Sequence, residues 1–251
     1  MVIGYIPFGD LFEIEFMTFV DSLETEIDTI LDTKWNERSG NVVPESSDIK
    51  LTNGAVEIEA TFLYADLAGS SVLAKLCPWE TTAKVIRAYL DCCTRLIRIY
   101  GGEIRSFDGD RVMGIFKGDS SNTQATNCAR EIDWVVEKIL NVKAKEKFKS
   151  IRENNLHIKH CVGIDFGKVR AVRAGIRNNN DLIWIGKAPS FAAKLSDVRH
   201  YPFSVYISVE CFGKLSESSK LSGTTSIWEP ALLKFAGEDK WVYRTKFMRT
   251  P

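Results

Sequence analysis

The sequence carries no excess charge of either sign and no long apolar run. Lysine plus arginine number 33, as do aspartate plus glutamate, so net charge gives no reason to expect a nucleic-acid partner or an anionic membrane. No apolar stretch approaches the roughly 20 residues of a membrane-spanning helix. Residues 1–10 also lack the basic start and small-residue cleavage site of a signal peptide. We therefore expect a cytosolic protein with no nucleic-acid or membrane partner.

Histidine and paired cysteine motifs are also missing. The 6 cysteines show no C-x-x-C spacing, and the 3 histidines form no motif with acidic or cysteine partners. A zinc site or a disulfide framework is therefore not expected, and buried thiols in a reducing compartment are the better interpretation. Neither G-x-x-x-x-G-K-[ST] nor G-x-G-x-x-G occurs, which argues against a Walker-type NTPase or a dinucleotide-binding protein.

The chain divides into a helical N-terminal part and an α/β part. Apolar residues at helical spacing predict one or two amphipathic helices over residues 8–35, and the polar stretch 36–53 is typical of a linker. We expect residues 1–53 to form this helical segment and linker, and residues 54–251 to form the catalytic domain. In that domain we predict strands at 57–64, 103–107, 111–116, 157–164, 169–174, 182–185, 203–209, 226–235 and 241–247.

Helices are predicted between these strands at 78–100, 122–141 and 188–198, the second ending before the lysine-rich residues 143–149. We expect the strands 157–164 and 169–174 to be joined by a turn at Gly167. Strand, helix, hairpin, helix, strand is the order of a ferredoxin-like βαββαβ core. The predicted fold class is therefore α/β (α+β), with an N-terminal helical segment before the core.

Two carboxylates stand out because each comes at an apolar strand beside small residues. Asp66 follows the strand in Phe-Leu-Tyr-Ala-Asp-Leu-Ala-Gly, and Asp110 ends the hairpin signal Asp108-Gly109-Asp110. If the hairpin lies beside the first strand, the two carboxylates converge and can share divalent cations, for which oxygen ligands suit Mg²⁺ and Mn²⁺. The alternative is that Asp66 is a helix-entry or turn residue and Asp110 an ordinary turn residue.

At this point the sequence resembles the class III nucleotidyl cyclases. The matching segments are Asp66 in F-x-Y-A-D-L, the Gly-Gly…Gly-Asp run at 101–110, Gly-Ile-Asp-Phe-Gly-Lys at 163–168, and Ile-Gly-Lys-Ala-Pro-Ser-Phe-Ala-Ala-Lys-Leu at 185–195. The resemblance covers about residues 57–247, including a closing strand at 234–243. It implies a homodimer with shared active sites, in which the metal-binding aspartates come from one subunit and the transition-state pair from the other.

The resemblance also implies roles for individual residues. Asp66 and Asp110 would bind two divalent cations, Mn²⁺ or Mg²⁺, with the Leu67 carbonyl as a further ligand. Lys168 takes the place of an arginine that grips the triphosphate, and Lys234 lies near another phosphate-binding position. Ser190 and Lys194 occupy the places of the family's catalytic asparagine and arginine; a lysine keeps the charge but not the planar fork. A solvated helix face is the alternative for Lys194.

The departures from the family pattern concern the base pocket. Ser106 and Ile183 stand where adenylyl cyclases read adenine, and Ile183 offers no hydrogen bond. The glutamate and cysteine that read guanine are missing too. Tyr64 precedes Asp66 by two residues and so shares its strand face, where its ring would favour a one-ring base; a core aromatic is the alternative. Arg105 and Asp108 flank Ser106, and the pocket position of Arg105 depends on a local distortion of the strand.

This pattern resembles the pyrimidine cyclases of bacterial anti-phage signalling. It implies conversion of UTP to cyclic UMP and pyrophosphate, with a separate cyclic-nucleotide-responsive effector downstream. The alternatives are a CTP-specific enzyme, an adenylyl cyclase with a degenerate base pocket, and a catalytically inactive cyclase fold that serves as a regulatory module. A diguanylate cyclase is less favoured, since no G-G-[DE]-E-F run is present.

Overall fold

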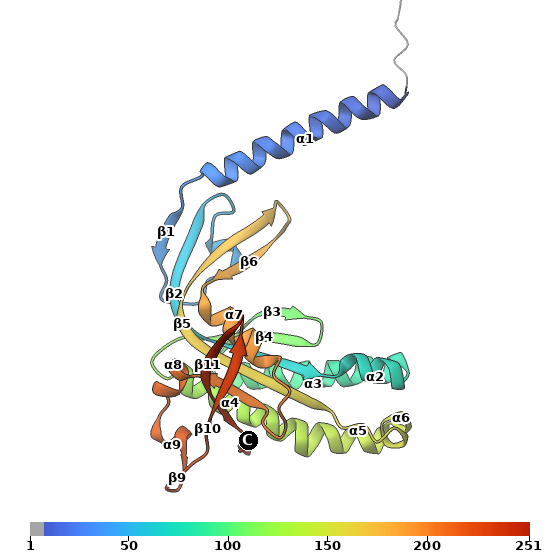
Figure 1. Cartoon of the computed structure of the whole chain (residues 1–251), viewed down its shortest axis with the longest axis vertical. Helices are drawn as coiled ribbons and strands as arrows, with labels where there is room; N and C mark the ends of the chain where they lie inside the picture. The colour runs from blue at the N-terminus through green and yellow to red at the C-terminus, as the bar shows by residue number, and fades with distance from the viewer. Residues whose placement is uncertain (1–7) are drawn as a thin grey trace, which may run out of the picture.

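One twisted, nine-stranded sheet organises the chain (Figure 1). The computed structural model describes the backbone of residues 8–251 and the side chains from residue 18 onward. The strands run in the order β10-β11-β7-β5-β2-β4-β3, with β1 added to β2 and β6 added to β5. The strands are β1 (Asn36–Ser39), β2 (Gly54–Ala68), β3 (Glu103–Asp108), β4 (Arg111–Phe116), β5 (Lys159–Ile176), β6 (Asn179–Ile185), β7 (Val205–Ser208), β10 (Glu229–Phe235) and β11 (Glu238–Thr245).

The predicted ferredoxin-like order is confirmed by the elements β2, α3, β3, β4, α4 and β5. β2 lies between β5 and β4, antiparallel to both, and β3 closes that edge of the sheet. The helices are α1 (Phe8–Asp32), α2 (Ser70–Leu76), α3 (Trp79–Ile99), α4 (Ser121–Val135), α5 (Asn141–Lys147), α6 (Lys149–Glu153), α7 (Lys187–Ser196), α8 (Val209–Gly213) and α9 (Glu217–Lys220). A 3₁₀ turn (Ser46–Asp48) and a small β8–β9 ribbon (Leu221–Ser222, Thr225–Ser226) complete the described elements.

The sheet is covered differently on its two faces, because successive strand residues point to opposite sides. Leu63, Ala65 and Leu67 of β2 pack in a large core with α3 and α4. The alternate residues, including Phe62, pack in a smaller core with Ala192 of α7. Tyr64 and Asp66 therefore belong to the face that α7 covers.

Three predictions about the chain's organisation are wrong. Gly167 is no turn, because β5 is one continuous strand in which Gly167 pairs with Ala60. The stretch 36–53 is not a free linker, because β1 pairs in parallel with β2 and both Val43 and Ile49 are buried. The second helix does not end before the lysine-rich residues: α4 continues through a π-helical turn (Val136–Leu140) into α5.

The N-terminal helix prediction is confirmed as a single helix, α1. It extends away from the sheet (Figure 1), and its apolar side chains Phe19, Leu23 and Ile27 are exposed. Within the described part of the chain, no helix is long and apolar enough to cross a membrane.

Candidate active site

The two predicted carboxylates meet at one end of the sheet. Asp66 lies inside β2, two residues before its end, and is only 8% exposed. Asp110 follows Gly109, whose φ of +61° makes the tight β3–β4 turn. The backbone N–H of Leu67 donates to the Asp110 carbonyl at 3.4 Å, so the turn is held against the end of β2. Burial raises the pKa of Asp66 despite the opposing effect of Arg199, and the nearby Asp110 carboxylate raises it further.

Two guanidinium groups share this end of the sheet. Arg199, in the loop after α7, donates a hydrogen bond to Oδ2 of Asp66. Arg111 lies directly opposite Asp66 on β4 and pairs with Asp108 at 2.7 Å and Asp197 at 3.6 Å. Both arginines partly offset the negative charge of the buried Asp66 carboxylate beside the half-buried Asp110.

The donor set fits a magnesium-type or manganese-type site that is completed by a substrate. Oδ2 of Asp110 is buried and has no hydrogen-bond partner among the described residues, which leaves a carboxylate oxygen available for a cation. No group of three or more His, Cys, Asp or Glu side chains in the described chain is arranged to hold a metal. Mg²⁺ is commonly bound by one or two carboxylates together with substrate phosphates and water. Asp66, Asp110 and the Leu67 carbonyl are suited to that mode.

A second row of residues crosses the same face next to the carboxylates. Tyr64 on β2 lies opposite Met113 on β4, and Met113 lies opposite Ser106 on β3. Because cross-strand partners share a face, these three side chains line one strip of the sheet. Tyr64 is half-buried, the Arg111 guanidinium lies 5.6 Å from its ring centre, and burial raises the pKa of its hydroxyl. This strip could form the floor of a base pocket beside the metal ligands.

Arg105 departs from the expected pocket position. A β-bulge between Ile104 and Ser106 leaves it without a partner on β4. Its side chain is 11% exposed and bridges Glu103 and Glu45, the second at 3.1 Å. In this arrangement Arg105 ties the 43–45 segment to the sheet, and its guanidinium is already paired.

Helix α7 presents Ser190 and Lys194 on its exposed side. Its buried side rests on Gly163, the residue opposite Tyr64 on β5. A Cβ at Gly163 would lie 2.1 Å from the Ala192 carbonyl oxygen and 2.4 Å from the Ser196 nitrogen. The glycine therefore permits α7 to lie directly on the sheet beside the Tyr64 strip.

The remaining predicted substrate-binding residues lie far from Asp66 in the same chain. Lys168 pairs with Glu59 on β2. Glu59 precedes Asp66 by seven residues, so the two lie about 23 Å apart along the strand. Ile183 pairs with Val172, and Val172 pairs with Ala55 of β2. Ala55 lies about 36 Å from Asp66 along that strand. Lys234 is on β10 at the opposite edge of the sheet from β3. One chain thus does not bring these three residues to its own carboxylates.

Comparison with known proteins decides the family. The chain is 40% identical over 237 residues to a uridylate cyclase of Rhodovulum sp. (strain MB263), which covers 94% of this chain and 99% of the relative. It is 35% identical over 216 residues to a uridylate cyclase of Burkholderia cepacia, across 85% and 92% of the two chains. The chain belongs to the uridylate cyclase family. No family model matches it.

The fold agrees with this family assignment. The solved guanylyl cyclase Cya2 superposes with a TM-score of 0.64, covering 78% of this chain and 95% of that one at 15% identity. Similarity at that level shows the fold alone, which is that of the class III cyclases. The fold-class prediction and the resemblance to pyrimidine cyclases are both confirmed.

Sequence reasoning missed three residues of this candidate site. Aligning the hairpin at Asp108-Gly109-Asp110 with β2 would have revealed Arg111 and Met113. That alignment places them opposite Asp66 and Tyr64. Arg199 carried no local signal, because only the path of the loop after α7 brings it to Asp66.

Proposed function

We propose that this chain converts UTP to 3′,5′-cyclic UMP and pyrophosphate, at active sites that two copies of the chain build together. The family supplies the substrate class: three relatives that are 35–40% identical are named uridylate cyclase. The observation that supports the proposal most strongly is the adjacency of Asp66, Asp110 and the Tyr64 strip on one face of the sheet. This adjacency supports a site in which the carboxylates bind the triphosphate through cations and the neighbouring strip contacts a small base.

The reaction is an internal phosphoryl transfer. The ribose 3′ oxygen forms a bond to the α-phosphorus, the bond from that phosphorus to the bridging oxygen breaks, pyrophosphate leaves, and the 3′-hydroxyl proton passes to solvent. Two Mn²⁺ or Mg²⁺ ions, when bound by Asp66, Asp110 and the Leu67 carbonyl, would lower the pKa of the 3′ hydroxyl and neutralise triphosphate charge.

The chain's own cations would position the triphosphate. We assign Lys168 and Lys234 to its β- and γ-phosphates and Lys194 to charge on the α-phosphate, where an ammonium acts as a point charge. Ser190 offers one hydroxyl to the ribose. Tyr64, Met113 and Ser106 would contact the uracil ring, with Arg111 above the tyrosine. Arg105 would support this pocket by holding Ser106's strand to the 43–45 segment, and Ile183 would contact the base only as an apolar surface.

The distances within one chain support a homodimer. Lys168 and Ile183 lie about 23 and 36 Å along β2 from Asp66, so we assign them to the site whose carboxylates belong to the other copy. The exposed side chains of Ser190 and Lys194 are available to such a partner. A two-fold dimer would hold two equivalent sites.

The substrate is tested by product identity. The full chain is incubated with Mn²⁺ and each of the four nucleoside triphosphates, and products are resolved by mass. We expect cyclic UMP from UTP, no product from Asp66→Ala, and full activity from the exposed control Asp119→Ala. Cyclic CMP or cyclic AMP as the main product would contradict the base assignment, and no product from any triphosphate would indicate an inactive cyclase fold.

The shared site is tested by mixing two inactive variants. Asp66→Ala and Lys194→Ala each disable a different half of a shared site. After subunit exchange, about a quarter of the wild-type activity should return, because half the dimers are mixed and each has one intact site. No recovery at any mixing ratio would contradict sites shared between subunits.

The cellular setting we propose is the cytosol of a bacterium, with cyclic UMP acting on a separate effector in defence against phage. The six cysteines are free thiols and five of them are buried, which is compatible with a reducing compartment. Cells that carry the chain and a cyclic-UMP-responsive effector should resist phage and lose that resistance with Asp66→Ala. Equal resistance with the variant would contradict a role for the product.

A further inference from the structure

An exposed cavity of about 530 Å³ lies just beyond the proposed metal ligands, at the same end of the sheet. Ala68 and Gly69, which follow Asp66 by two and three residues, form one wall. The other walls are helix α2, the residues 155–159 that lead into β5, and residues 199 and 201 of the loop after α7. The cavity therefore adjoins the candidate active site.

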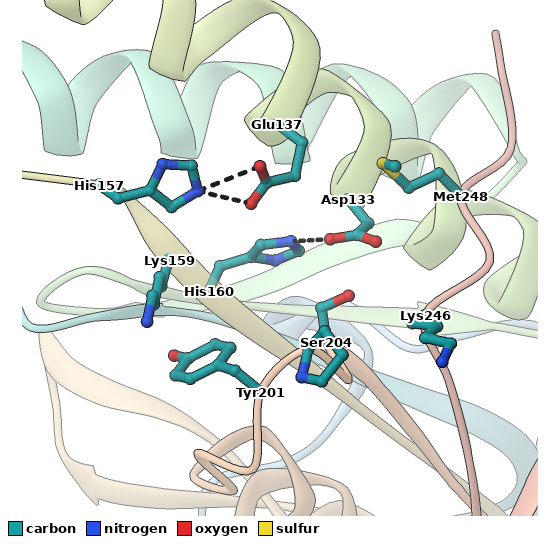
Figure 2. Close-up of a pocket in the computed structure, with 10 residues that line it drawn as sticks. Asp133, Glu137, His157, Lys159, His160, Tyr201, Ser204, Lys246 and Met248 are labelled. Carbon is teal, nitrogen blue, oxygen red and sulfur yellow. Dashed lines mark hydrogen bonds and ion pairs between the residues drawn. The ribbon is translucent and has the colours of Figure 1, made fainter.

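Lys159 is on the same side of the sheet as Asp66. It pairs with Ala68, as Cys161 pairs with Asp66, and because cross-strand partners share a face and alternate residues repeat it, its side chain belongs to the α7 face. It lies two residues, or about 7 Å, further along the strand than Asp66. The side chain is exposed, and its Nζ lies 4.3 Å from the centre of the Tyr201 ring, towards which it points in Figure 2. Its ammonium group is therefore accessible.

Arg199 contributes a second accessible cation. Its Nη2 donates to Oδ2 of Asp66, and its Nη1 donates to the carbonyl oxygens of Ser196 and Val198. The side chain is nevertheless 36% exposed. The two Nη1 bonds hold the guanidinium to its own loop, so it stays beside Asp66 when a divalent cation takes the carboxylate oxygen that Nη2 contacts.

The charge on the cavity walls is positive. Lys159 and Arg199 line it, and no aspartate or glutamate is among the described residues of its walls. Glu137 lies behind one wall residue, His157, which it contacts at 2.9 Å. Divalent cations at Asp66 would offset that carboxylate and leave the guanidinium to pair with another anion. The walls then offer two positive charges to an anionic group.

We propose that Lys159 and Arg199 bind the terminal phosphates of the substrate and the pyrophosphate that leaves. This assignment rests on the proposed function, because Mg²⁺ is commonly bound by carboxylates together with substrate phosphates, which brings phosphate oxygens beside Asp66. Arg199 thus has two partners, the Asp66 carboxylate in the empty site and a phosphate in the loaded one. Lys159 contacts the phosphates as a point charge. Both cations come from the copy that supplies Asp66, whereas Lys168 comes from the other copy.

Inorganic pyrophosphate is the probe, because it carries phosphates without a ribose or a base. The full chain in saturating Mg²⁺ is titrated with pyrophosphate by calorimetry, and the wild type should bind it saturably. Lys159→Ala and Arg199→Ala should each weaken this binding about fivefold or more, and Lys159→Arg, which keeps the charge, should restore it. Mn²⁺ alone should bind Arg199→Ala more tightly, since Asp66 loses a competing partner. Opposite responses to the two ligands are not expected from a merely misfolded variant.

Two exposed residues provide matched controls. Lys147 is on α5, and Arg95 pairs with Asp91 on the surface of α3 at 2.8 Å. Lys147→Ala and Arg95→Ala should bind pyrophosphate within about twofold of the wild type. Weakening by these controls equal to that in Lys159→Ala would overturn the proposal, because any lost positive charge would then suffice.

The proposal is also overturned if the wild type binds no pyrophosphate, or if Lys159→Ala and Arg199→Ala bind it as the wild type does. Asp66→Ala separates this outcome from failure of the proposed function. Loss of pyrophosphate binding in Asp66→Ala, beside wild-type affinity in the other two variants, would leave the metal ligands in place and remove only the phosphate assignment. An error in the identity of the base leaves pyrophosphate binding unchanged.

Discussion

Replacing Asp165 with asparagine should stabilise this protein at neutral pH. Asp165 lies on β5 beneath α7, is fully buried, and accepts one hydrogen bond, from the backbone N–H of Phe166 at 2.8 Å. Its other carboxylate oxygen has no hydrogen-bond partner within the described structure. Burial raises the pKa of this carboxyl from 3.8 to about 6, although Ser208, the Phe166 N–H and Lys187 act in the opposite direction.

The magnitude follows from proton linkage. A rise in pKa from 3.8 to about 6 corresponds to about 3 kcal/mol at 1.36 kcal/mol for each pH unit. The folded state binds this proton more tightly than the unfolded state, so the carboxyl favours folding below about pH 4. This stabilisation is lost as the pH rises towards 6. Above pH 6 the buried anion lowers the free energy of unfolding by the full amount of about 3 kcal/mol. Asparagine is neutral at every pH and keeps the acceptor for Phe166.

The assay is urea unfolding followed by tryptophan fluorescence between pH 4.5 and 7.5. Asp165→Asn should unfold with a free energy up to about 3 kcal/mol higher than the wild type at pH 7.5, and the difference should shrink to about 1 kcal/mol at pH 4.5. The exposed control Asp119→Asn should change the free energy by less than about 0.5 kcal/mol at any pH. A destabilised Asp165→Asn at pH 7.5, or a difference independent of pH, would show that burial of the Asp165 anion does not cost stability.

Three further substitutions test other parts of the account. Gly163→Ala should destabilise the fold by about 1–3 kcal/mol and lower kcat, because the new methyl group meets the backbone of α7; an unchanged melting temperature and kcat would contradict that contact. Arg199→Ala should tighten Mn²⁺ binding about two- to fivefold in calorimetry without nucleotide, because it removes the cation paired with Asp66, whereas weaker binding would show that Arg199 supports the site. Ile27→Glu on the exposed apolar side of α1 should raise the dimer dissociation constant in sedimentation, and an unchanged constant would place α1 outside the dimer interface.

The two candidate metal-binding carboxylates were predictable because their signals are local. Asp66 comes at an apolar strand beside Gly69, and Asp110 ends an Asp-Gly turn, so sequence alone located both and suggested their pairing. Tyr64 followed from strand parity. The Arg105 position did not, because a bulge places it outside the β3–β4 ladder, and the sequence of the strand contains nothing that distinguishes a bulged residue from a paired one.

Two errors in the fold have a common physical cause. Gly167 and the polar stretch 36–53 both have turn-like composition, but in each case tertiary packing decides the structure. Gly167 stays in the strand because β2 supplies a continuous ladder partner. The 36–53 stretch is fixed by two apolar side chains, Val43 and Ile49, which are buried against the sheet. Composition over a window of residues does not reveal two such anchors.

We propose that Asp66 and Asp110 jointly hold the divalent cations of a uridine nucleotide, and their roles can be checked by counting bound Mn²⁺. Electron paramagnetic resonance would count bound Mn²⁺ on the full chain in the presence of a non-cleavable UTP analogue. We expect two tightly bound ions per active site in the wild type, and loss of tight binding in both Asp66→Asn and Asp110→Asn. Wild-type binding by either variant, with its fold intact, would show that its carboxylate does not hold the ions.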